Sequence, residues 1–80
     1  MFQVYVLRSL KDQKLYIGMT DDLPARLEKH KNGRVPSTKH RRPLVLVYQE
    51  NCETRVDARR REKFLKSGPG HEFLRGSLLK

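Results

Sequence analysis

At 80 residues the chain is long enough for one domain, residues 1–80, and too short for a second module, so any specificity domain would be another chain. A single cysteine, Cys52, excludes an internal disulfide and favours a reducing, cytoplasmic setting, and no apolar stretch approaches the roughly 20 residues that span a bilayer. The net charge of +9 favours a polyanionic partner, nucleic acid well ahead of an anionic membrane surface, with a merely solvated basic surface as the alternative.

Two short apolar runs begin the chain, at residues 2–7 and 15–19. The polar residues 11–14 lie between them, and this pattern predicts a β-hairpin with a four-residue loop. We expect Leu10 to pair with Leu15, which sets the register of the whole hairpin.

Each predicted strand carries one tyrosine, Tyr5 or Tyr16. In the expected register Tyr5 faces Thr20 and Tyr16 faces Ser9, so both phenols project from the same side of the sheet. Gly18 would leave an opening between them. A single strand tyrosine is usually explained by packing, so the pair gains weight only from polar residues that later elements bring to this face.

The next element is predicted to be a helix over residues 22–32. Asp21 or Asp22 can cap its start, Pro24 suits the first turn, and Asn32-Gly33 can close it.

On this helix Leu23 and Leu27 mark the buried stripe. Arg26 and His30 lie four positions apart on its flank and can both lean toward the sheet. The alternatives are a surface cation for Arg26 and a solvated or helix-terminal histidine for His30.

Residues 33–43 are predicted to form a loop, because they have almost nothing to bury. Its hydroxyl and basic side chains suit phosphate contacts that do not read sequence, and the candidates are Lys39, His40, Arg41 and Arg42. An ordinary solvated connection is the alternative.

The apolar run at residues 44–48 follows Pro43 and predicts a central or well-covered strand. A helix over residues 56–67, capped by Thr54, and a short last helix over about 71–79 complete the chain. The predicted order is ββαβαα, an α/β domain of the α+β type with a small, mainly antiparallel three-stranded sheet flanked by helices.

Glu62 lies between Ala58 and Leu65 on the inner stripe of the predicted second helix, where a carboxylate is partly desolvated. Its neighbours in sequence are mainly basic, and a simple salt bridge to one of them is the alternative explanation; they are Arg59, Arg60, Arg61, Lys63 and Lys66. Two of these basic neighbours, Lys63 and Lys66, are further candidates for nucleic-acid contacts.

Four features follow one another along the chain: Val4-Tyr5-Val6, Tyr16-Ile17-Gly18, Arg26, and Glu62 within Arg61-Glu62-Lys63. This ordered set resembles the GIY-YIG nuclease domain family. The resemblance covers nearly the whole chain and is strongest to the small stand-alone members, which are related to the N-terminal nuclease domain of a bacterial excinuclease. Three positions depart from the pattern: Val4 replaces the first glycine of the family's name, Met19 stands where excinuclease-like members have a lysine, and His40 stands where a glycine is expected.

The resemblance implies metal-dependent cleavage of DNA, with RNA as the second candidate substrate and one Mg²⁺ or Mn²⁺ ion as cofactor. Tyr16 would deprotonate or position the attacking water with support from Tyr5, Arg26 would stabilise phosphate charge, and Glu62 would hold the metal. His30 falls where some members have a functional histidine. Since a tyrosine has an ordinary pKa of about 10, it needs cationic surroundings to act as a base at neutral pH.

Two other functions are compatible with the sequence. A non-catalytic nucleic-acid-binding module would keep the basic surface without turnover. An interaction protein that docks an acidic partner would fit the charge but would leave Tyr5, Tyr16 and Glu62 unexplained.

Overall fold

The computed structural model describes residues 1–78, and its elements follow the predicted order ββαβαα, with one short 3₁₀ helix inserted before the third strand. The elements are β1 (Phe2–Ser9), β2 (Leu15–Thr20), α1 (Leu23–Lys31), η1 (Lys39–Arg41), β3 (Leu44–Cys52), α2 (Arg55–Lys66) and α3 (Gly68–Leu78). The last helix therefore begins directly after α2, and the expected final position 79 lies outside the described residues.

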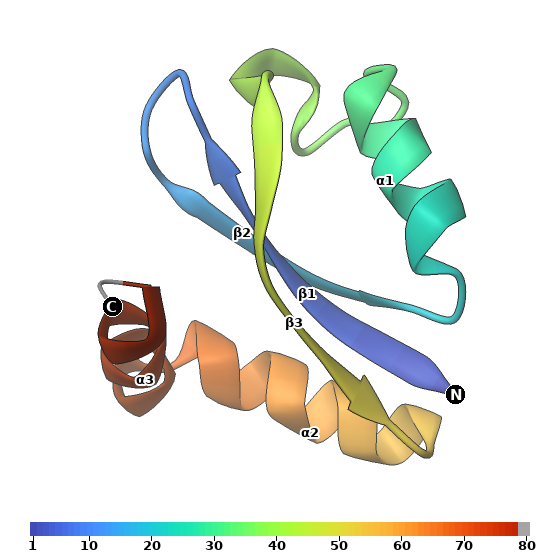
Figure 1. The fold of residues 1–80 in the computed structure, drawn as a ribbon, viewed down its shortest axis with the longest axis vertical. Helices are drawn as coiled ribbons and strands as arrows, with labels where there is room; N and C mark the ends of the chain where they lie inside the picture. The colour runs from blue at the N-terminus through green and yellow to red at the C-terminus, as the bar shows by residue number, and fades with distance from the viewer. Residues whose placement is uncertain (79–80) are drawn as a thin grey trace.

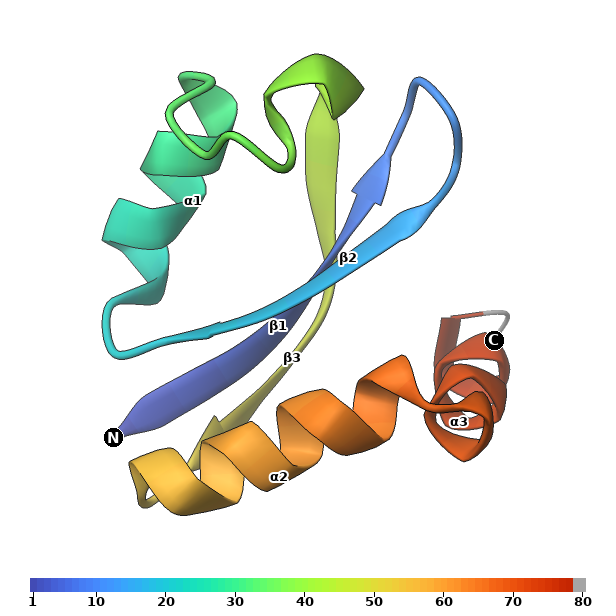
Figure 2. The same cartoon turned by 180° about the vertical axis from the view of Figure 1, so that it is seen from behind.

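The three strands form one antiparallel sheet in the order β2-β1-β3, so the first strand of the chain is the central one. Helix α1 and the segment after it cover one face, and α2 and α3 cover the other (Figures 1 and 2). The small antiparallel sheet flanked by helices is thereby confirmed.

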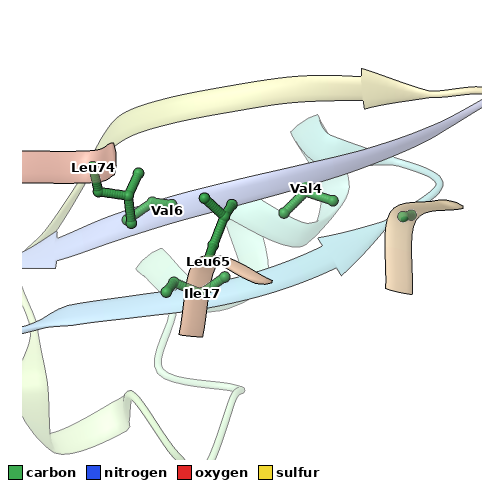
Figure 3. Packing of buried hydrophobic residues seen from close by; sticks show 6 residues of the cluster. Val4, Val6, Ile17, Leu65 and Leu74 are labelled. Carbon is green, nitrogen blue, oxygen red and sulfur yellow. The ribbon is translucent and has the colours of Figure 1, made fainter. Parts of the chain in front are cut away.

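Residues of β1 alternate between two small hydrophobic clusters, because successive side chains point to opposite faces of a strand. Val4 and Val6 pack with Ile17 against α2 and α3, where the core side chains are Ala58, Leu65 and Leu74 (Figure 3). Tyr5 and Leu7 point to the other face and pack against Leu23 of α1. The second cluster is small, and a polar site shares the face with it.

The expected register of the hairpin is wrong by two residues. Tyr5 pairs with Gly18, and Arg8 pairs with Leu15 in place of Leu10. The reason lies in the turn, where the hydroxyl of Ser9 accepts hydrogen bonds from the backbone N–H groups of residues 11 and 12, so the first strand ends earlier. A shift of two keeps every side chain on its face, and the two tyrosines still share one side.

Strand β3 is an edge strand, so of the two positions expected for it, central or well covered, the central one is wrong. Its apolar run has a different cause: Leu44 packs toward α1, whereas Val47 and Tyr48 pack toward α2 and α3, with an irregularity in the pairing opposite Val6 and Leu7. Leu46 is left 41% exposed.

Local capping fixes where the first two α-helices start. The side chain of Asp22 accepts a hydrogen bond from the backbone N–H of Ala25, and that of Thr54 accepts one from Asp57. Midway along α2, the guanidinium of Arg61 donates two hydrogen bonds to the Glu50 carboxylate on β3, at 2.5 and 3.2 Å. This bidentate pair fixes the rotation of α2 against the sheet. None of the helices in residues 1–78 has the length and hydrophobicity of a membrane span.

Candidate active site

The two tyrosines meet over a glycine. Tyr5 is fully buried in β1, and its ring centroid lies 6.2 Å from that of the half-buried Tyr16. A Cβ atom at Gly18 would lie 2.7 Å from the Tyr5 hydroxyl and 3.1 Å from Cε1 of Tyr16. The space that Gly18 leaves is therefore filled by the Tyr5 phenol, and only glycine permits this approach.

A chain of hydrogen bonds links three segments through Tyr5. Nε of Arg26 donates to the Tyr5 hydroxyl over 3.3 Å, and that hydroxyl lies 2.9 Å from Nε2 of His30. On the far side of the ring, Nδ1 of His30 lies 2.8 Å from the Thr38 hydroxyl. The central strand, α1 and the loop that follows α1 thus share one buried polar network.

One set of proton positions uses every donor in this network once. The Thr38 hydroxyl donates to the backbone carbonyl of Val35, at 3.5 Å, and accepts from Nδ1–H of His30. Nε2 is then an acceptor for the Tyr5 hydroxyl, whose oxygen accepts from Arg26. Tyr5 is therefore fixed on both sides and holds the Arg26 guanidinium in place.

The surroundings of this network shift its ionisation. Burial raises the pKa of Tyr5, and the Arg26 guanidinium offsets part of that effect. Burial and the positive charge of Arg26 lower the pKa of His30, which is consistent with a neutral imidazole at neutral pH. The hydrogen bond to Tyr5 raises the pKa of Arg26, with smaller contributions from Tyr16, so Arg26 stays charged beside both phenols.

His30 is only 1% exposed, which overturns the solvated position considered for it. Its ring centroid lies 5.1 Å from that of Tyr16 in an edge-on arrangement. Thr38 was not among the sequence-based candidates, although it is fully buried and holds the second ring nitrogen. Its position in a polar, basic segment gave no signal of burial.

A hollow of about 370 Å³ opens beside this network, between the end of β2, α1 and α2. Arg26 and Glu62 both line it, although they lie 36 positions apart in the sequence. Its other polar lining residues are Thr20, Asp21, Arg55 and Arg59. The two arginines of α2 were not among the sequence-based candidates, and they supply positive charge in the hollow that Met19 also lines.

The Glu62 side chain is 18% exposed, and its only ion-pair partner within residues 1–78 is Lys66, at 3.5 Å on the next turn. The arginine nearest in sequence, Arg61, is engaged with Glu50 on β3. The Lys66 side chain is 56% exposed, so this pair adds little to stability. The carboxylate of Glu62 therefore remains available to a ligand in the hollow.

The donor set of the hollow fits a hydrated dication. Within the described chain no three His, Cys, Asp or Glu side chains gather into a ready-made metal cage. Mg²⁺ does not need one, since it keeps several waters and binds proteins through one or two carboxylates. Glu62 can provide such a ligand, and Asp21 places a second carboxylate at the same hollow.

The basic candidates of residues 33–43 are divided between two places. Lys39, His40 and Arg42 line a larger hollow next to His30. Arg41 instead turns to the hairpin loop, where it lies 3.6 Å from Asp12 and donates to the carbonyl of Leu15. On α2, Lys63 is exposed.

The buried His30 predicts a pH dependence of stability. Because its pKa in the folded state lies below the ordinary 6.5, the unfolded chain takes up a proton that the folded chain resists as the pH falls. Unfolding free energy should therefore decrease below about pH 6.5, by at most about 1.4 kcal/mol per pH unit from this group. Denaturant titrations from pH 7.5 to 5 should give a smaller decrease for His30→Gln. The matched variant His71→Gln, at an exposed histidine, should keep the wild-type slope, and equal slopes for all three proteins would contradict the assignment.

A family model described as the GIY-YIG catalytic domain matches residues 1–70. The chain is also 42% identical to the UPF0213 protein of Staphylococcus aureus strain Mu3 over 73 residues. These matched residues make up 90% of this chain and 88% of that relative. The UPF0213 proteins SAV0488 of strain Mu50 and SA0446 of strain N315 match with the same identity and coverage. No solved structure matches the chain.

The chain therefore belongs to the GIY-YIG family, as its motifs indicated. This is a family of nuclease domains, so the class of protein that the fold and the paired tyrosines define is nuclease-like.

Proposed function

We propose that the chain is a metal-dependent endonuclease that hydrolyses phosphodiester bonds in DNA without strong sequence preference. The observation that carries this proposal is the double role of Arg26. Its Nε is bound to the buried Tyr5, and the same side chain lines the hollow that contains Glu62. A fixed cation beside a carboxylate that is paired only with an exposed lysine suits phosphate hydrolysis with one metal ion.

The roles of the residues follow from their exposure. Tyr5 is fully buried and bonded on both sides, so it positions Arg26 and does not reach water. Tyr16 is partly exposed next to it and is the phenol that can orient or deprotonate the attacking water. The Nη groups of Arg26 would neutralise charge that develops on the phosphate oxygens.

Glu62, with Asp21 nearby, would hold a Mg²⁺ or Mn²⁺ ion. When bound, such an ion supplies positive charge for the phosphate and for the leaving oxygen. Arg55 and Arg59, which line the same hollow, would bind and orient the flanking phosphates.

A Tyr16→Phe variant tests this proposal. Purified wild-type protein should nick plain and branched duplexes in Mg²⁺ or Mn²⁺ and not in EDTA, and Tyr16→Phe should cleave about 10²-fold more slowly because the proton-transfer group is lost. The control is Tyr48→Phe, which removes a hydroxyl bonded to Glu50 at 2.6 Å and keeps the half-buried ring that packs against Phe73 of α3. That control should lower thermal stability and leave the cleavage rate of folded protein unchanged.

Failure of wild-type protein to cut any of these substrates would contradict the proposal. Salt-sensitive binding of the same DNA would then favour a non-catalytic nucleic-acid-binding module.

A further inference from the structure

The larger of the two hollows is lined by His30 and not by Arg26, and it has a volume of about 740 Å³. Pockets that hold small ligands measure about 300–1,000 Å³, so its size fits a ligand larger than a single phosphate group. It is formed where the end of α1, the following basic segment and the start of β3 meet.

The polar lining of this hollow is cationic. Lys31, Lys39 and Arg42 line it together with Lys11 and His40, and no carboxylate of residues 1–78 lines it. Within residues 1–78 none of the ion pairs involves Lys31, Lys39 or Arg42. Clustered cations without a counter-charge repel one another, and an anionic ligand relieves that repulsion.

Part of this rim is held rigidly. The guanidinium of Arg42 donates to the backbone carbonyls of Lys39, at 3.0 Å, and Lys31, at 3.2 Å. It lies over Gly33, whose φ of +72° is in the left-handed region that favours glycine. Arg42 thus links the backbone of Lys31 to that of Lys39, so the spacing of these two lysines is set before any ligand binds.

The remaining lining is apolar. Leu7, Pro43 and Leu44 contribute to the hollow, and Leu7 is almost fully buried beneath it. An inorganic phosphate would leave this surface unused. A ligand with both a negative charge and a flat apolar part would use the whole hollow, and a nucleotide has that chemistry.

The two hollows adjoin the same site. His30 lines the larger one, and Arg26, one helical turn earlier, lines the one that holds Glu62. Side chains four positions apart on a helix are neighbours, with about 5–6 Å between their Cβ atoms. A single strand that places a phosphate at Arg26 can therefore reach the larger hollow with an adjacent nucleotide.

We propose that the larger hollow receives one unpaired nucleotide of the DNA substrate, with its base against Leu7, Pro43 and Leu44 and its phosphate between Lys31 and Lys39. This inference rests on the proposed function, in that it takes DNA as the substrate. A paired nucleotide would have to be extracted from the duplex first, so an already unpaired one binds at lower cost. The chain should accordingly prefer DNA with an unpaired nucleotide over perfect duplex.

The test is a binding comparison in EDTA, where no metal-dependent cleavage occurs. A duplex with a single 2-aminopurine bulge should bind about tenfold more tightly than the same duplex with 2-aminopurine paired, which corresponds to about 1.4 kcal/mol of added contact. The emission of bulged 2-aminopurine should change on binding, whereas that of the paired base should not. An abasic bulge keeps the extra sugar and phosphate but has no base, so it should lose most of the preference.

The double variant Lys31→Ala/Lys39→Ala should bring the ratio of bulge to duplex affinity close to one. The double variant Lys14→Ala/Lys29→Ala removes the same two charges at exposed positions outside the hollow and should keep the wild-type ratio. Equal affinity of wild-type protein for bulged and perfect duplex, or for base-containing and abasic bulges, would overturn the inference. Cleavage in Mg²⁺ is measured separately: a bulge preference without cleavage would reject the proposed endonuclease and keep this binding site.

Discussion

Glu62→Gln is expected to reduce metal-dependent cleavage to an undetectable level while the protein stays folded. Glutamine keeps the size and helix propensity of glutamate but lacks the charge that a hard dication requires of its ligand. The loss of the pair with the exposed Lys66 should cost at most about 1 kcal/mol. DNA affinity measured in EDTA should stay the same or rise, because a negative charge leaves a basic surface.

The chain offers a close control for this variant. Glu72 of α3 forms a similar intrahelical pair with Arg75, at 3.2 Å, and Glu72→Gln removes the same charge elsewhere. Cleavage by wild type, Glu62→Gln and Glu72→Gln should be compared in Mg²⁺, Mn²⁺ and EDTA, beside thermal melts. Metal-dependent nicking by folded Glu62→Gln at the wild-type rate would remove Glu62 from the site.

Arg26→Ala is the second change with a large expected effect. Loss of one preorganised group that stabilises developing charge lowers rates by about 10²–10³-fold, and we expect a decrease of this size in single-turnover cleavage. Affinity for DNA should fall only modestly, because other arginines line the same hollow. Arg26→Lys should recover part of the rate, since lysine restores the charge without the planar fork.

Stability has to be followed alongside the rate, because Arg26→Ala also removes a donor from the Tyr5 hydroxyl. That hydroxyl keeps its contact with His30, so the melting temperature should fall only slightly. Arg60→Ala is the matched control: Arg60 is an exposed arginine of α2 that does not line the hollow. An equal loss of affinity and no loss of single-turnover rate in Arg26→Ala would make this residue a phosphate anchor only.

The sequence was sufficient to predict the order of elements and the side of the sheet on which the tyrosines lie. Both depend on hydrophobic periodicity and on local capping residues such as Asp22 and Thr54. The register of the hairpin was not predictable, because it depends on hydrogen bonds of the Ser9 hydroxyl within the turn. The edge position of β3 was missed because a short apolar run has the same sequence pattern in two cases. It can be a central strand, or an edge strand whose two halves pack against helices on opposite faces of the sheet.

The site was predictable only in part for a related reason. Tyr5, Tyr16, Arg26 and Glu62 could be selected as residues with suitable chemistry. The hydrogen bond between His30 and Thr38 could not be predicted, because it depends on how an irregular segment folds back onto α1. The position of Arg59 in the hollow could not be predicted either, because the sequence does not distinguish Arg59 from the neighbouring arginines on a solvated helix surface.

The complete burial of Tyr5 restricts how a protein of this kind can change in evolution. Tyr5 belongs to the hydrophobic cluster of one sheet face and to the proposed site, so a substitution that alters its chemistry also damages the core. A domain of this size has little stability to spare for such changes. New substrate preferences would therefore arise first at exposed cations such as Lys31, Lys39 and Arg59, where replacement leaves the fold intact.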